Sequence, residues 1–131
     1  MEAETPKAHE SKAMFWAGIV ASTLALLMLV PSAIMKLVKP PMVLEGFGKY
    51  GYAEGIITPL GIVELTCTII YLIPQTSVLG AILLTGYLGG AVSTHVRAGE
   101  PFIGAVGCGV LVWLGLFLRN SRLRGLILGR S

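Results

Sequence analysis

The residues from Ile56 to Ile73 form an apolar stretch long enough to cross a lipid bilayer as a helix, yet Glu64 lies near its middle. An ionised carboxylate that faces lipid at this depth costs at least about 2.5 kcal/mol. Glu64 should therefore face the protein interior, where it either finds polar partners or stays protonated. We expect the other apolar segments, and the few polar groups within them, to surround this residue.

Further apolar segments and a low content of charged residues indicate an integral membrane protein. Only 13% of the 131 residues are charged, against about 25% in an average soluble domain. The apolar segments predict four membrane-spanning helices, at about residues 13–35, 56–73, 77–95 and 102–118. The predicted fold class is an all-α, up-down-up-down four-helix bundle, because only helices and closed barrels satisfy their backbone within a bilayer.

The predicted membrane domain covers residues 13–118 and has a polar tail at each end. Residues 1–12 are polar and mixed in charge, which predicts a disordered tail. Residues 119–131 form a basic tail with four arginines and no acidic residue. For the connection over residues 36–55 two alternatives stay open: a short amphipathic segment in the membrane interface, or an ordinary loop with anchoring aromatic residues.

The distribution of basic residues favours a cytoplasmic location for both ends of the chain. Four spans place both termini on one side of the membrane, and six Lys and Arg residues lie on that side against four on the other. Nucleic-acid binding would need a wider basic surface, so nucleic acid is not an expected partner. The expected surroundings are the lipid bilayer of a cell or inner membrane.

The polar residues of the predicted spans gather in the non-cytoplasmic half of the membrane. At a rise of 1.5 Å per residue, Glu64 should lie about 12 Å below the outer end of its helix. His95 and Arg97 lie at the outer end of the third span, and Lys36 lies at the outer end of the first. Thr85 reaches the level of Glu64. These groups therefore predict a polar site in one half of the bundle.

Two interpretations of this site stay open. In the first, Glu64 and His95 form an acid–base or ligand-polarising pair in a lipophilic pocket, since histidine and a buried carboxyl group can share a proton. In the second, Glu64 belongs to a hydrogen-bonded polar cluster with a purely structural role, and the basic side chains extend to the membrane interface. The candidate ligand-binding residues of the first interpretation are Lys36, Thr85, Tyr87 and Arg97.

Thiol redox and metal chemistry have little support in the sequence. Cys67 and Cys108 are not part of a Cys-x-x-Cys motif, and their predicted depths differ by about 7 Å, which does not suit a disulfide. One histidine and one carboxylate within the spans make half a metal site at most, so no metal is expected. The glycines at 86, 89 and 90, and those at 104, 107 and 109, predict faces for close helix packing.

Three segments carry a resemblance to a known family. Residues 32–37 have a small-residue–Lys–Leu pattern, residues 61–65 are followed by Leu-Ile-Pro at 72–74, and residues 80–95 end in histidine. Together they resemble the DoxX-like family of small four-helix membrane proteins, over residues 13–118. The glutamate of the second span and the histidine that ends the third are the most specific points. The resemblance implies a fold, and the wider group includes a thiosulfate:quinone oxidoreductase subunit, parts of redox assemblies and receptor-assembly chaperones.

Three functions fit these observations. In the first, a lipophilic molecule such as a quinone occupies a pocket in the outer half of the bundle, and the protein serves a membrane redox system. In the second, the protein is an enzyme in which Glu64 and His95 transfer protons on a lipophilic substrate, as in isomerisation or epoxide opening. In the third, it is a membrane chaperone or scaffold. Membrane redox proteins and a second copy of the chain are the candidate protein partners.

Overall fold

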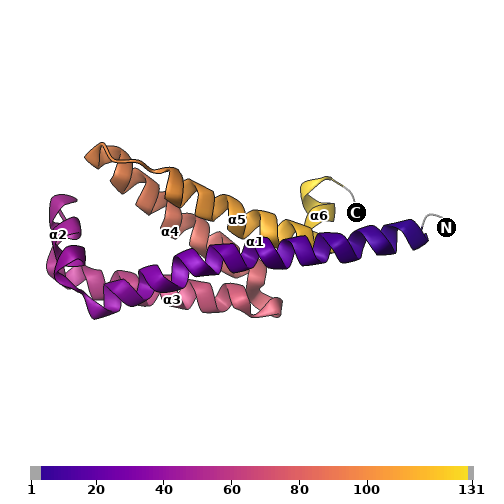
Figure 1. The fold of residues 1–131 in the computed structure, drawn as a ribbon, viewed down its shortest axis with the longest axis horizontal. Coiled ribbons are helices and arrows are strands. Elements are labelled where there is room, and N and C mark those ends of the chain that lie inside the picture. The colour runs from indigo at the N-terminus through magenta and orange to yellow at the C-terminus, as the bar shows by residue number, and fades with distance from the viewer. Residues whose placement is uncertain (1–3, 130–131) are drawn as a thin grey trace.

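The computed structural model describes residues 4–129, and all regular structure in that range is helical (Figure 1). The elements are α1 (Glu4–Val38), α2 (Pro41–Lys49), η1 (Glu54–Ile56), α3 (Ile57–Leu72), η2 (Pro74–Thr76), α4 (Ser77–Ala98), α5 (Ile103–Arg119) and α6 (Ser121–Ile127). The two η elements are single 3₁₀ turns that precede α3 and α4. The predicted all-α fold is confirmed.

Three helical segments are long and apolar enough to cross a membrane by themselves: Lys12–Val38, Glu54–Leu72 and Pro74–Ala98. α5 meets the same test only together with α6, from which it is bent by 110°. Many large apolar side chains lie on the outside of the helices, where lipid rather than water suits them. The chain is an integral membrane protein, whereas the fourth span and the up-down-up-down order remain predictions.

The four longest helices pack in a cycle, in which α1 and α4 each contact both α3 and α5. Figure 1 shows α1 running alongside α3 and α5 for much of its length. The buried face of α1 carries alanines at 21, 25 and 33, which are about one and two helical turns apart. Small residues at this spacing let neighbouring helices approach closely, which is the usual way that membrane helices pack.

Glycine permits the closest helix contacts, but not at the positions that the sequence predicted. A Cβ added to Gly80 of α4 would collide with the backbone of Tyr71 on α3, and one added to Gly115 of α5 would collide with Ser22 on α1. An added Cβ meets nothing within 4 Å at Gly86, Gly89, Gly90, Gly104 and Gly107. The prediction that these five glycines pack against another helix of the chain is therefore wrong.

Two polar segments are more regular than the sequence indicates. α1 begins at Glu4, so from that residue on it includes the segment predicted to be a disordered tail. Lys, Glu and Ala are good helix formers, and Pro6 falls in the first turn, where proline is tolerated. In the connection between α1 and α3, residues Pro41–Lys49 form the helix α2, with proline at its first position. The segment is therefore helical rather than an ordinary loop, and its place in the membrane interface stays a prediction.

Gly80→Ala should destabilise the protein, because the added methyl group would displace the backbone of α3 at Tyr71. Overpacking of this kind costs about 1–3 kcal/mol, and the thermal unfolding midpoint in detergent should fall accordingly. Gly86→Ala in the same helix is the matched control, since open space surrounds that position and alanine favours the helix. An unchanged midpoint in Gly80→Ala would contradict the close contact between α3 and α4.

Candidate functional site

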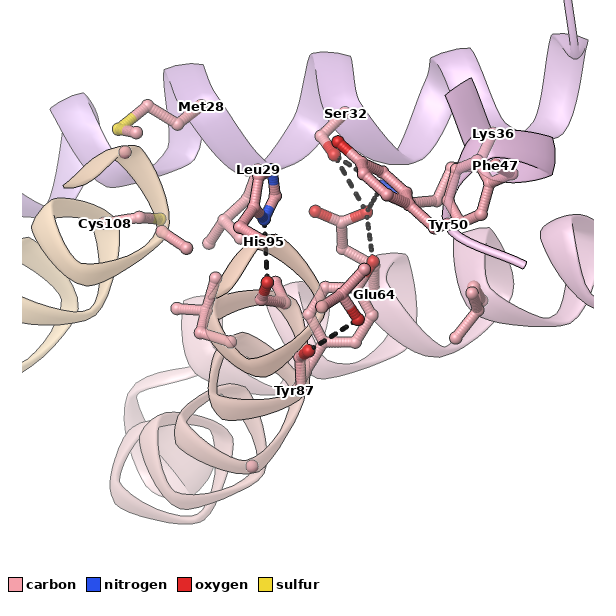
Figure 2. A pocket seen from close by; sticks show the side chains of 18 of the residues that line it. Met28, Leu29, Ser32, Lys36, Phe47, Tyr50, Glu64, Tyr87, His95 and Cys108 are labelled. Atoms are coloured by element: carbon pink, nitrogen blue, oxygen red, sulfur yellow. Dashed lines mark hydrogen bonds and ion pairs between the residues drawn. The ribbon is translucent and has the colours of Figure 1, made fainter. Parts of the chain in front are cut away.

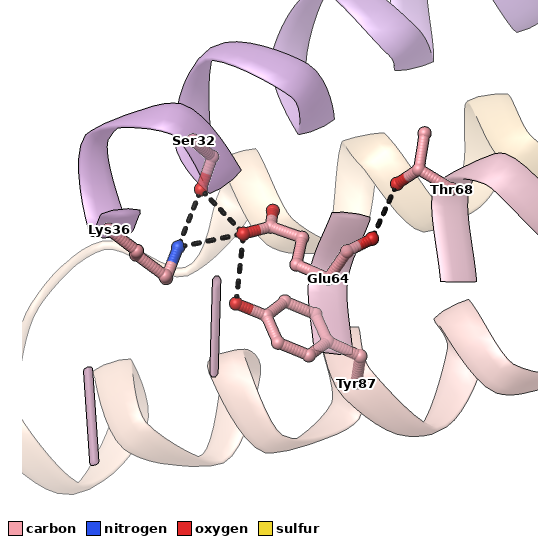
Figure 3. A network of polar contacts seen from close by, with 5 residues as sticks. All are labelled: Ser32, Lys36, Glu64, Thr68 and Tyr87. Atoms are coloured by element: carbon pink, nitrogen blue, oxygen red, sulfur yellow. Dashed lines mark hydrogen bonds and ion pairs between the residues drawn. The ribbon is translucent and has the colours of Figure 1, made fainter. Parts of the chain in front are cut away.

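Glu64 lies in the middle of α3, is 2% exposed, and binds three side chains through one oxygen (Figure 3). Its Oε1 accepts hydrogen bonds from Lys36 Nζ at 2.9 Å, from the Tyr87 hydroxyl at 3.1 Å and from the Ser32 hydroxyl at 3.2 Å. Lys36 Nζ also donates to Ser32 Oγ at 2.7 Å. An ammonium and two hydroxyls from α1 and α4 thus compensate the buried carboxylate, as its depth in the membrane requires.

Local helix geometry brings these groups together. Ser32 and Lys36 are four residues apart on α1, so they lie on one face of the helix. On α3, Gly61 lies one turn before Glu64 and opposite α1. A Cβ added to Gly61 would lie 2.9 Å from Lys36 Cβ and 3.2 Å from the Ala33 carbonyl oxygen. The missing side chain therefore allows α1 to approach α3 closely enough for the ion pair to form.

A cavity of about 490 Å³ opens beside this cluster, with walls from α1 to α5 (Figure 2). Figure 2 shows Met28 and Cys108 on one side of the cavity, Lys36 and Tyr50 on the other, and Glu64 between them. The polar residues that line it are Ser32, Lys36, Tyr50, Tyr52, Glu64, Tyr87, Thr94 and His95. The cavity therefore combines an apolar wall with a buried ion pair.

His95 lines the same cavity as Glu64 but does not bond to it. Its Nδ1 lies 2.7 Å from the backbone oxygen of Ala91. Since a carbonyl oxygen only accepts, Nδ1 carries the hydrogen in this bond, and Nε2 is left for another partner. The ring lies 5.5 Å from that of Tyr50, between centroids. The proposed acid–base pair would therefore need a molecule between its two members.

The structure places two of the predicted site residues away from the cavity. Thr85 accepts a hydrogen bond from Trp113 Nε1 at 2.6 Å and lines a separate groove between α4 and α5. Arg97 is exposed and lies 3.4 Å from the backbone oxygen of Tyr50. Thr85 and Tyr87 are two residues apart, which is about 200° around a helix, so only one of them can face Glu64. Lys36, Tyr87 and His95 are the residues that line the cavity with Glu64.

Sequence reasoning missed four polar residues of the cavity: Ser32, Tyr50, Tyr52 and Thr94. Ser32 could have been found from its four-residue spacing to Lys36. Tyr50 and Tyr52 could not, because their positions depend on how the connection after α2 folds back onto the bundle. The Tyr50 hydroxyl donates to Glu100 at 2.5 Å, and the Tyr52 hydroxyl lies 2.8 Å from Thr94 Oγ1. The hydrogen bond to Glu100, together with burial and the negative charge of Glu100, raises the pKa of Tyr50.

A second polar cluster lies in the other half of the bundle. The Tyr71 hydroxyl donates to the backbone oxygen of Val112 at 2.7 Å and lies 3.0 Å from Ser22 Oγ. Arg119 Nε donates to the same Ser22 oxygen at 3.1 Å, and its guanidinium lies 5.6 Å from the centre of the Tyr71 ring. Arg119, predicted as part of a basic tail, is thus the last residue of α5 and connects that helix to α1.

The cysteines are buried and carry free thiols, Cys67 on α3 and Cys108 on α5. Cys108 lines the cavity. Among residues 4–129, no group of three or more His, Cys, Asp or Glu side chains comes together as the ligands of a metal ion would.

These features define a small all-helical integral membrane protein with a charged cluster beside an internal cavity. The sequence profile of the DoxX-like family matches residues 20–118. The chain therefore belongs to the DoxX-like family, which confirms the resemblance seen in the sequence. A search of curated proteins and a search of solved structures returned no match.

Lys36→Met should destabilise the protein strongly, because it leaves the Glu64 carboxylate buried without its cation. Removing one partner of a buried ion pair typically costs about 3–5 kcal/mol. The double variant Lys36→Met/Glu64→Gln should recover most of this loss, since no charge is then left unpaired. Thermal or denaturant unfolding in detergent would measure both, and additive losses in the double variant would contradict a direct pair.

Tyr50→Phe should lower the thermal midpoint at neutral pH, because it removes the hydrogen bond to Glu100. The pKa of Tyr50 is raised in the folded protein. Its bond therefore stabilises the fold fully below the ordinary tyrosine value of about 10 and is lost as pH rises through the raised value. The midpoints of wild type and variant should converge in that alkaline range. Glu100→Gln should remove the same pH dependence, and a pH-independent difference between wild type and Tyr50→Phe would contradict this account.

Proposed function

We propose that the protein binds a lipophilic molecule with a polar head group, such as a quinone, in the cavity beside Glu64, and that it serves a membrane redox system. The observation that supports this function is that apolar side chains and the Lys36–Glu64 ion pair line the same cavity. A volume of about 490 Å³ lies in the range of small-molecule sites, which are mostly apolar with a few placed polar groups.

The polar residues indicate how such a molecule would lie. Its head group would occupy the space between Glu64, Lys36 and His95, and its apolar part would extend towards Met28 and Cys108. Burial of the apolar part supplies most of the affinity, whereas the polar contacts fix the orientation.

The proposal includes the membrane arrangement that the sequence predicts. α5 has 17 residues and a length of about 25 Å, which lies at the lower end of the range for a spanning helix. With α5 as the fourth span, the bundle is up-down-up-down and both termini are cytoplasmic. The cavity then lies in the outer half of the membrane.

An acid–base enzyme is the second candidate. The observation that favours it is that Glu64 and His95 line one cavity without bonding to each other, and that His95 Nε2 is left for another partner. A substrate between them would contact both groups at once, as proton transfer requires. Binding and catalysis would then use the same cavity. Whether the cavity binds a lipophilic molecule is therefore the first question to test, before any enzymatic activity is measured.

Gly90→Leu should abolish lipophile binding, because position 90 lines the cavity and has open space where the new side chain would enter it. The matched control is Gly107→Leu, where space is also open but which does not line the cavity. Mass spectrometry of gently solubilised protein should find a discrete lipophile with wild type and Gly107→Leu that is missing from Gly90→Leu.

If wild type and Gly90→Leu retain the same molecules in the same amounts, the cavity is not the binding site. The unfolding midpoints of both variants should be recorded beside the extracts, so that loss of ligand is not confused with loss of fold.

A further inference from the structure

Among the described residues, one oxygen of the Glu64 carboxylate has three partners and the other has none. All three hydrogen bonds from Ser32, Lys36 and Tyr87 end on Oε1, and no described residue donates to Oε2 (Figure 3). Within the described part of the chain, no fully buried side-chain oxygen or nitrogen lacks a partner. Oε2 therefore retains some access to space, and Figure 2 shows that this oxygen points into the cavity that Glu64 lines.

The hydroxyl groups around the cavity have already used their hydrogens. Those of Ser32 and Tyr87 donate to Glu64, and that of Tyr50 donates to Glu100. Thr94 donates to the backbone oxygen of Gly90, so the hydrogen between Tyr52 and Thr94 comes from Tyr52. A ligand cannot receive a hydrogen bond from any of these hydroxyls without breaking one that exists.

The polar groups of the cavity that are still free to bind a ligand are mainly hydrogen-bond acceptors. Glu64 Oε2 accepts only, when the carboxylate is ionised and paired with Lys36. In the neutral ring of His95, Nδ1 holds the hydrogen and Nε2 accepts. Among the described side chains that line the cavity, the one unused donor is the third N–H of Lys36, whose other two point to Ser32 and Glu64.

We propose that the cavity selects a head group that donates a hydrogen bond, a hydroxyl of the phenol or hydroquinone class, over the same head group with carbonyls only. A hydroxyl can donate to Glu64 Oε2 and still accept from Lys36. A carbonyl accepts only, so it would leave Oε2 without a partner and bring two electron-rich oxygens together. This inference rests on the proposed function, and it assigns the reduced form of a quinone-type ligand to the site.

The test compares an n-decyl hydroquinone with the matching n-decyl quinone, which have nearly the same size and shape. Binding of each to the full chain in lipid nanodiscs is measured by calorimetry without oxygen, so that the two forms do not interconvert. The hydroquinone should bind wild type at least about tenfold more tightly, as expected for a hydrogen bond to a charged acceptor.

Glu64→Gln should reverse this preference. The three donors around Oε1 need an acceptor, so the amide oxygen should take that place and turn the NH₂ group towards the cavity. The site then offers a donor where wild type offers an acceptor, and the quinone should bind at least as tightly as the hydroquinone. If this variant does not fold, the comparison of the two probes on wild type still decides the matter.

Gly90→Leu separates the failure of this inference from the failure of the proposed function. If wild type binds neither probe better than Gly90→Leu does, the cavity is not a lipophile site and the proposed function fails. If both probes bind wild type, lose their binding in Gly90→Leu, and bind equally or with the quinone preferred, the cavity is a lipophile site and the donor preference is wrong.

Discussion

The ion pair between Lys36 and Glu64 is the interaction on which the half of the bundle around the cavity depends. Two charges within apolar surroundings are costly unless they are paired and hydrogen-bonded. The pairing requires α1 to lie against α3, which Gly61 permits, and the hydroxyl of Tyr87 adds α4 to the same oxygen. Side chains from three helices therefore meet at Glu64 Oε1. The relative positions of these helices around that atom fix the shape of the cavity.

Counting residues along the predicted helices gives the level of each polar group along the bundle, but it does not show towards which neighbour each side chain points. A helix rises by a constant 1.5 Å per residue, so the level of Glu64 and its distance from the ends of neighbouring spans follow from counting. Which side chain faces it depends on how each helix is rotated about its axis, and the helices are apolar nearly all round. For this reason Thr85 was expected at the site although it faces a different groove, and the tyrosines beyond α2 were not expected there.

The glycines also show that the sequence alone does not reveal what each face of a helix lies against. The sequence predicted close packing at Gly86 and Gly90, whereas the close contacts occur at Gly18, Gly61, Gly80 and Gly115. A missing side chain either lets a helix approach or leaves space, and the outcome depends on what lies opposite. Gly86 and Gly90 face the cavity, so their missing side chains contribute to its volume.

The two polar clusters of the bundle differ in a way that favours a binding role for one of them. In the cluster of Ser22, Tyr71 and Arg119, each hydroxyl hydrogen has an acceptor within the protein, and none of the three residues lines the cavity. The two hydroxyls of that cluster are satisfied within the protein, and the cluster holds α1, α3 and α5 together. Around Glu64, one carboxylate oxygen has no donor among the described residues and faces the cavity. A polar cluster with a purely structural role would gain stability by satisfying that oxygen from within, so its position at the cavity supports the proposed ligand site.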